Sequence, residues 1–320
     1  MSQKFIITYP GQGSQKIGMG RDFFKSHRVA KEVFEEVDDS LGERLSKIIF
    51  EGPQEKLTLT SNTQPALMAV SIAISRVLEY ETKKNIYDIG EVIIGHSLGE
   101  YTALCSLGVI NLKQTSQLLK IRGKSMQNSV KELKTKMVAS IGLEIHRVEK
   151  VIDETPLPVN EVCEIANDNC TGQVILSGTK DGVDIISNIL KKDGARSIIE
   201  LEVSAPFHCS LMRQPSIVMK ENLDKIEFKK LKSKFVSNVT GSFEYDLKNI
   251  KDLLIQQTCS KVKWRQSIIN CIKLSKNVLE IGSGKVLSGM NKRINKDINT
   301  QNISTLEDLD LFLNLNKENI

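Results

Sequence analysis

The chain has 320 residues and a formal net charge of +5, with 40% hydrophobic and 26% charged residues. This composition excludes an intrinsically disordered chain, because it supplies enough apolar side chains for a large core. The lysines are interspersed with acidic residues and no nucleic-acid-binding motif accompanies them, so no nucleic acid partner is expected. A mild basic excess would still favour docking of an acidic protein partner.

The N-terminal sequence and the cysteines indicate the compartment. The apolar run after Met1 is too short for a signal peptide, and no stretch approaches the roughly 20 apolar residues that span a bilayer, so no membrane partner is expected. The six cysteines include no Cys-x-x-Cys pair, which argues against a zinc site and a secreted disulfide framework. We therefore expect a cytoplasmic protein without a metal site.

The first third of the chain alternates predicted strands and helices. The predicted strands cover residues 5–9 and 92–94, and the predicted helices cover residues 23–37, 63–79, 101–107 and 112–127. Strands that alternate with helices in this way indicate a parallel sheet covered by helices.

The pattern changes between residues 130 and 205. The predicted elements are strand 136–142, helix 144–153, strands 163–167 and 173–177, helix 181–192 and strand 196–203. Because β-α-β-β-α-β is the ferredoxin-like order, residues 130–205 are expected to form a small α+β subdomain. It is inserted into a core made of residues 1–129 and 206–320, whose strands near 235–239 and 278–281 rejoin the main sheet. The segment after residue 290 is expected to be a mixed surface segment.

A Gly-x-Ser-x-Gly run occupies residues 95–99, directly after the predicted strand 92–94 and before a predicted helix. This is the pattern of a nucleophile elbow, a turn so sharp that glycines must flank the serine. Ser97 would stand at the tip of the turn, and the N-terminal amides of the following helix would face an oxyanion formed there. The alternative is a structural turn, but the strand and helix around it favour a catalytic serine.

A serine nucleophile needs a base, and the chain offers only four histidines. His27 and His146 lie among charged residues and read as solvated, while the side chain of His96 should diverge from its neighbour Ser97. His208 follows a Pro-Phe pair in an ordered, partly apolar loop and is the predicted base. No Asp or Glu is marked by a motif as a third member, and a backbone carbonyl would suffice to fix the tautomer.

Arg122 lies at the end of an apolar helical stretch that would pack behind the elbow. A buried arginine needs an anion, and its planar fork matches a carboxylate. One alternative is a structural ion pair. The other, combined with a serine nucleophile, is an acyl substrate that carries a free carboxylate.

Two glycine-rich runs resemble phosphate-binding motifs without matching them. Residues 11–16 lack the third glycine of a dinucleotide fingerprint, and residues 281–286 lack the first glycine and the Ser/Thr of a P-loop. The first run is better interpreted as a strand-to-helix loop in which the amide of Gln12 joins that of Leu98 in an oxyanion hole.

Taken together, these residues resemble the malonyl-CoA:acyl carrier protein transacylases of type II fatty-acid synthesis, over nearly the whole chain. Several motifs in the same order are far more specific than any one of them. The runs that carry the resemblance are PGQGSQ (10–15), TQPAL (63–67), GHSLGEY (95–101), RG (122–123), SAPFH (204–208) and EIGSGKVL (280–287).

The resemblance implies an α/β fold, with a hydrolase-like parallel-sheet core that carries a nucleophile elbow and an inserted ferredoxin-like subdomain. It makes Ser97 the acylated nucleophile and His208 its base. It places the oxyanion hole at the amides of Gln12 and Leu98, and the malonyl carboxylate on Arg122.

The resemblance also implies residues around this centre. In the family a main-chain carbonyl orients the histidine, within a segment that matches Lys263-Trp264, so the carbonyl of Lys263 is expected to do so here. Family members often have Gln or Arg at this position, a difference of little consequence for a backbone contact. Phe207 looks like the malonyl-selecting form of related domains. Gln64, Asn167 and Asn169 are expected to contribute to the substrate cleft.

The implied cycle is ping-pong. Malonyl-CoA acylates the serine, and the phosphopantetheine thiol of acyl carrier protein then takes the malonyl group, with no metal or redox cofactor. A monomer is expected. One alternative is a discrete acyltransferase of a polyketide or polyunsaturated fatty-acid synthase, and another is a serine esterase or thioesterase, which would have no use for Arg122. A non-catalytic carrier-binding module is disfavoured by the intact Ser97, His208 and Arg122.

Overall fold

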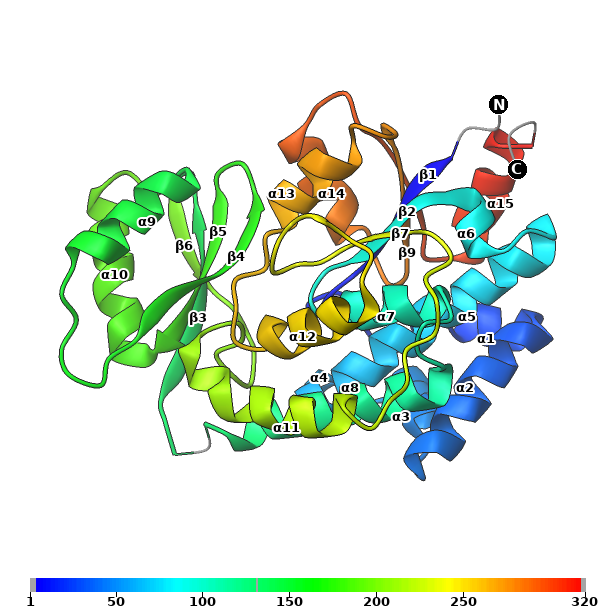
Figure 1. Cartoon of the computed structure of the whole chain (residues 1–320), viewed down its shortest axis with the longest axis horizontal. Helices are drawn as coiled ribbons and strands as arrows, with labels where there is room; N and C mark the ends of the chain where they lie inside the picture. The colour runs from blue at the N-terminus through cyan, green and yellow to red at the C-terminus, as the bar shows by residue number, and fades with distance from the viewer. Residues whose placement is uncertain (1–3, 131, 318–320) are drawn as a thin grey trace.

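The computed structural model describes residues 4–130 and 132–317, which form two sheets with helices around them (Figure 1). The larger sheet has six strands in the order β10-β9-β1-β2-β7-β8. Its pairs are parallel except β7 with β8. Its strands are β1 (Phe5–Tyr9), β2 (Gly90–Gly95), β7 (Lys234–Val236), β8 (Phe243–Glu244), β9 (Asn277–Ile281) and β10 (Asn299–Ile303).

Helices cover both faces of this sheet, as predicted from the alternating pattern. Ile7 and Ile93 of neighbouring strands pack into a core with the helices α5, α7 and α8. Ile6 and Val92 point to the opposite face, where they meet the helices α13 and α14. The bounds on the first side are α5 (Thr60–Thr82), α7 (Leu98–Ser106) and α8 (Leu112–Asn128), and on the second α13 (Trp264–Cys271) and α14 (Val286–Ile294). The central strands β1 and β2 are mostly apolar because both of their faces are buried.

The helix predicted over residues 23–37 is two helices. The chain is extended at His27, where φ is −126° and ψ is 120°, and this separates α1 from α2. The Ser26 hydroxyl donates to the Asp22 carbonyl at 2.7 Å, a local competition for backbone groups that accompanies helix ends. The helices not yet given are α1 (Arg21–Ser26), α2 (Arg28–Leu41), α3 (Leu45–Glu51), α4 (Gln54–Thr58), α6 (Ile86–Ile89), α11 (Arg213–Leu223), α12 (Leu247–Gln257) and α15 (Leu306–Leu315), with a 3₁₀ turn at Ser210–Met212.

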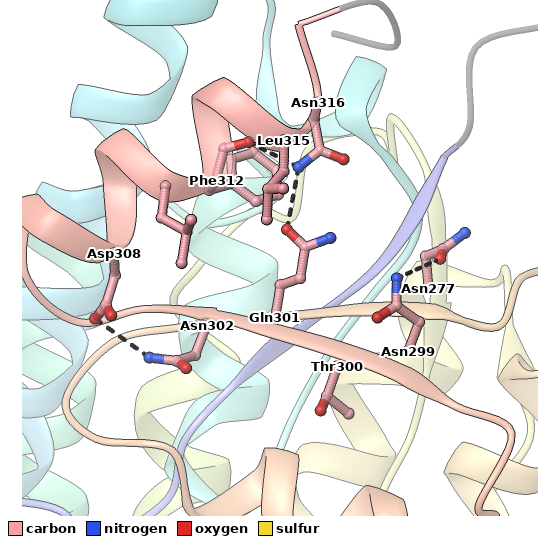
Figure 2. Close-up of a pocket in the computed structure, with 10 residues that line it drawn as sticks. Asn277, Asn299, Thr300, Gln301, Asn302, Asp308, Phe312, Leu315 and Asn316 are labelled. Carbon is pink, nitrogen blue, oxygen red and sulfur yellow. Dashed lines mark hydrogen bonds between the residues drawn. The ribbon is translucent and has the colours of Figure 1, made fainter.

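The segment after residue 290 is part of the fold, so the expectation of a mixed surface segment is wrong. β10 pairs in parallel with β9, and Phe312 of α15 stacks on Phe5 with ring centroids 5.4 Å apart. The strand is hard to recognise in the sequence because four of its five residues are polar, and several of their side chains bond to nearby residues (Figure 2). Asn302 donates to Asp308 at 3.3 Å, and Asn316 donates to Gln301 at 3.0 Å, around a pocket of about 490 Å³ at the sheet edge.

The smaller sheet has the ferredoxin-like element order that the sequence predicts. Its strands run in the order β4-β5-β3-β6 and all of their pairs are antiparallel. The elements are β3 (Thr135–Ile141), α9 (Ile145–Glu154), β4 (Cys163–Cys170), β5 (Gln173–Thr179), α10 (Lys180–Lys192) and β6 (Ser197–Glu200). In Figure 1, α9 and α10 lie on the side of this sheet that faces away from the larger one.

The last predicted strand of this unit, 196–203, is shorter than expected and ends at Glu200. The chain then leaves the sheet in a loop that carries His208. β4 also bonds to the larger unit, because the Asp168 amide donates to the Val262 carbonyl at 2.9 Å. The domain boundaries at residues 130 and 205 therefore stay a prediction.

Within the described residues, no helix is both long and apolar enough to cross a membrane.

Candidate active site

The turn between β2 and α7 has the geometry of the predicted elbow. Ser97 has φ 53° and ψ −110°, and α7 begins at the next residue. A Cβ on Gly95 would lie 1.9 Å from the Gly99 carbonyl oxygen, and one on Gly99 would lie 2.3 Å from the Tyr9 carbonyl oxygen. Both positions therefore require glycine, and the strain at Ser97 is held by its surroundings.

Ser97 and His208 face each other across the site. The Ser97 Oγ lies 2.8 Å from His208 Nε2, and His208 Nδ1 lies 2.7 Å from the carbonyl oxygen of Gln257. The ring nitrogen that faces a carbonyl must carry the proton, so Nε2 is left to accept the serine hydroxyl. Burial, reinforced by the Arg122 charge, lowers the pKa of His208 to about 3, which keeps the imidazole neutral at physiological pH, so that Nε2 has a free lone pair.

The expectation that Lys263 orients this histidine is wrong, because the acceptor is the carbonyl of Gln257. Gln257 ends α12, and the last carbonyls of a helix have no partner within it. The carbonyl of Lys263 instead accepts the Ser267 amide at 3.0 Å in the first turn of α13. A main-chain contact leaves no residue-type signal, so the sequence could not identify which carbonyl makes it.

The side chains of the other histidines have other partners or are exposed. His96 bonds through Nε2 to the Asn169 side-chain oxygen at 2.9 Å, and its ring centroid lies 5.4 Å from that of Trp264. His146 is exposed and His27 is half-buried beside Glu81. Among the four histidines, only His208 bonds to the Ser97 side chain.

Arg122 reaches the site from α8 and is 1% exposed. Its Nη2 lies 3.3 Å from the Ser97 Oγ, while Nη1 and Nη2 donate at 2.9 Å to the side-chain oxygens of Gln64 and Gln257 respectively. Among the described residues, no carboxylate lies within 4.0 Å of the guanidinium, which rules out the structural ion pair there. The buried Nε also has no partner in that part of the chain. The guanidinium thus presents its charge beside the nucleophile.

Polar residues that the sequence reading missed surround the elbow. The side-chain nitrogen of Gln257 donates to the Ser97 carbonyl at 2.9 Å and to the Glu100 carboxylate. The side chain of Asn238 accepts the Ser97 amide at 2.7 Å and donates to the Gly95 carbonyl at 2.8 Å. Asn238 follows β7 at the carboxyl edge of the parallel sheet, where such sites gather. Its position directly after a predicted strand was the one signal in the sequence that could have identified Asn238 as a site residue.

The two predicted oxyanion-hole amides belong to Gln12, just beyond β1, and Leu98, the first residue of α7. Neither amide hydrogen-bonds to a described residue. The Leu98 amide lies at the N-terminus of α7, where it is unpaired within the helix and is stabilised by an anion. These two amides are therefore available as donors.

A cleft of about 190 Å³ lies next to the elbow, between the two sheets. Gln12 and His96 line it from the larger unit, and Asn167 and Asn169 line it from β4 of the smaller unit. Phe207 is buried beside Ile175 in the adjoining apolar cluster. The predicted cleft residues thus come from both units. Within the described residues, no group of three or more His, Cys, Asp or Glu side chains is placed to hold a metal ion.

Comparisons with known proteins identify the family of the chain. A family model described as the acyl transferase domain matches residues 5–288. The chain is 39% identical over 316 residues to the malonyl CoA-acyl carrier protein transacylase of Bacillus subtilis, with 98% of each chain covered. It is 36% identical over 292 residues to the protein of the same name from Escherichia coli K12, covering 91% of this chain and 93% of the other.

Solved structures show the same similarity. The acyl-carrier-protein-S-malonyltransferase of Bartonella henselae has a TM-score of 0.92 at 42% identity, covering 98% of this chain and 100% of the other. A malonyl-transacylase in complex with a type II polyketide acyl-carrier protein gives a TM-score of 0.92 at 33% identity, with the same coverage.

Proposed function

The chain belongs to the family of malonyl CoA-acyl carrier protein transacylases, and we propose that it moves a malonyl group from malonyl-CoA to the phosphopantetheine thiol of an acyl carrier protein, for fatty-acid synthesis. One observation carries the proposal: the Ser97 hydroxyl lies between a neutral histidine and a guanidinium that has no carboxylate partner among the described residues. A simple esterase has no use for that guanidinium.

In the first half-reaction the Ser97 oxygen attacks the thioester carbonyl while His208 Nε2 takes the hydroxyl proton. The Gln257 carbonyl holds Nδ1–H and stabilises the imidazolium that forms. The amides of Gln12 and Leu98 donate to the tetrahedral oxyanion. The C–S bond then breaks, the leaving thiolate takes the proton from Nε2, and a malonyl ester remains on Ser97.

The second half-reaction reverses these proton transfers. The carrier thiol gives its proton to His208 and attacks the ester carbonyl. The C–O bond to Ser97 breaks, and the serine oxygen recovers the proton from Nε2. The chain's own groups supply nucleophile, base and oxyanion donors, so we propose that the cycle needs no metal or redox cofactor.

Arg122 gives the site its preference for malonyl. The free carboxylate of a malonyl ester is separated from the ester carbonyl by one methylene, so it must lie close to the Ser97 Oγ. The Nη2 atom of the guanidinium is already 3.3 Å from that oxygen. A carboxylate that accepts from this group gains a charge-assisted bond that an acetyl group lacks. Phe207, Gln64 and Asn167 complete the proposed substrate surroundings.

The intact-protein mass tests this function. Malonyl-CoA should add a malonyl-sized mass, which should leave when phosphopantetheinylated acyl carrier protein is added and becomes malonylated. A gain that is lost equally fast without carrier would indicate a hydrolase. No gain would contradict the role of Ser97.

A second candidate is transfer to a polyketide carrier, favoured by the similarity to the transacylase solved with a type II polyketide acyl-carrier protein. Comparison of malonylation rates on fatty-acid and polyketide carriers separates the two. We further propose that the chain acts in the cytoplasm as a monomer, with malonyl-CoA and acyl carrier protein as its partners and no nucleic acid or membrane.

A further inference from the structure

Glu100 is a carboxylate that the mechanism does not use, buried one turn into α7 behind the nucleophile. It is 0% exposed. One carboxyl oxygen accepts the Asn238 amide at 3.3 Å, and the other accepts the side-chain nitrogen of Gln257. The Ser237 hydroxyl also adjoins the carboxyl group. A carboxylate is not buried this deeply without a compensating charge nearby.

Arg122 provides that charge through one neutral amide. The Gln257 side chain accepts from Arg122 Nη2 at 2.9 Å with its oxygen and donates to Glu100 with its nitrogen. The amide dipole therefore has its negative end on the cation and its positive end on the anion. Among the described groups around Glu100, Arg122 of α8 is the charged neighbour and Tyr101 of α7 the titratable one. Ser237, Asn238 and Gln257 are neutral.

The charge count changes when substrate arrives. In the free site, ionised Glu100 and Arg122 balance. A malonyl carboxylate on Arg122 would leave two buried anions against one cation, which is costly in a medium of low dielectric. Ser97 and His208 are neutral in this state, so they do not restore the balance.

We propose that Glu100 is the counter-charge of Arg122 in the free enzyme and takes up a proton from the buffer when the malonyl carboxylate binds. This inference rests on the proposed function and adds a proton linkage to it. The new carboxyl O–H has an acceptor at hand in the buried Ser237 hydroxyl. Burial raises the pKa of Glu100 to about 7, so the protonated form is within reach at physiological pH. Glu100 acts through Gln257 and Arg122, as a positioning residue.

Calorimetry on the S97A variant, which binds without turnover, measures this proton. Titrations at pH 8 in two buffers of different ionisation enthalpy give the protons taken up, and titration with CoA subtracts the contribution of the phosphates. We expect the protein to take up at least about half a proton more per site on binding malonyl-CoA than on binding CoA. Its Kd should then rise by up to about tenfold per pH unit above pH 7, the limit for one linked proton.

A double variant with Glu100→Gln should lose the extra proton and this pH dependence. A double variant with Glu91→Gln makes the same change in a half-exposed carboxylate of β2 that pairs with Lys234 of β7, and should keep both. Equal proton uptake with malonyl-CoA and CoA in S97A would overturn the inference even if the Glu100 variant did not fold. The inference would also be overturned if a folded Glu100→Gln variant kept the extra proton uptake and the pH dependence of Kd. Binding of CoA without binding of malonyl-CoA would overturn the proposed function together with the inference.

Discussion

Replacement of Arg122 by alanine should convert a malonyl-selective site into one that discriminates poorly between malonyl and acetyl groups. The guanidinium is 1% exposed and lies 3.3 Å from the nucleophile, so its loss leaves a malonyl carboxylate buried without a partner. Truncation of one member of a buried charge pair costs about 2–5 kcal/mol. At 1.36 kcal/mol per factor of ten, this corresponds to a loss of roughly 30- to 5000-fold in kcat/KM for malonyl-CoA.

The same substitution should lower kcat/KM for acetyl-CoA much less, because an acetyl group makes no ion pair with Arg122. The malonyl-to-acetyl ratio of kcat/KM should therefore fall by at least about 30-fold. Arg122→Lys, which keeps the charge but loses the planar fork, should give an intermediate ratio. Lys124→Ala, on the exposed face of the same helix, is the matched control and should leave the ratio unchanged.

The assay is transfer to phosphopantetheinylated carrier, with malonyl-CoA and acetyl-CoA compared over the same enzyme preparation. Loss of the contacts to Gln64 and Gln257 lowers stability as well, so the melting temperature of each variant is measured alongside. A folded Arg122→Ala protein that keeps the wild-type malonyl preference would refute the carboxylate-binding role of Arg122.

Ser97→Ala should abolish the malonyl mass gain without lowering the melting temperature; a retained adduct would exclude Ser97 as nucleophile. His208→Ala should slow acylation by several orders of magnitude in rapid-quench experiments. A near-normal rate would contradict the role of His208 and make His96 the candidate base. Burial lowers the pKa of His208 to about 3. Below pH 6.5 this histidine is therefore protonated in the unfolded chain and stays neutral in the folded chain. In urea melts this group should therefore lower the free energy of unfolding by about 1.4 kcal/mol for each pH unit of acidification below 6.5. Equal slopes of unfolding free energy against pH in wild type and His208→Gln would contradict this. Gln257→Ala keeps the carbonyl that holds His208 but removes the side chain, so kcat/KM should fall by roughly 5- to 150-fold, for hydrogen bonds worth about 1–3 kcal/mol; an unchanged value would show that its side-chain contacts are dispensable.

The parts of the fold that the sequence predicts are those whose signal is local. The elbow around Ser97 is recognisable because its two flanking glycines have no room for a Cβ. β2 is recognisable because a strand buried on both faces is continuously apolar. β10 was missed for the converse reason, since an edge strand with polar side chains resembles a loop. The break at His27 was missed because the helical periodicity continues across it.

The site divides in the same way. Ser97, His208 and Arg122 can be singled out because few residue types perform their chemistry and the chain offers few candidates. Gln257 and Asn238 cannot, because the partners of their side chains at the elbow are more than 130 residues away in the chain. A buried glutamine in a sequence is indistinguishable from a surface one until its neighbours are known. The expectation for Lys263 failed because the contact to His208 is made by a main-chain carbonyl, which every residue carries.

Gln257 explains how one guanidinium can be both stable and available. A carboxylate placed directly on Arg122 would satisfy its charge and compete with the substrate for its donors. With the amide of Gln257 between Arg122 and Glu100, the opposite charge lies near enough to stabilise the buried cation without bonding directly to it. The carbonyl of the same residue holds His208, so one residue at the end of α12 fixes the base and the carboxylate-binding group relative to each other.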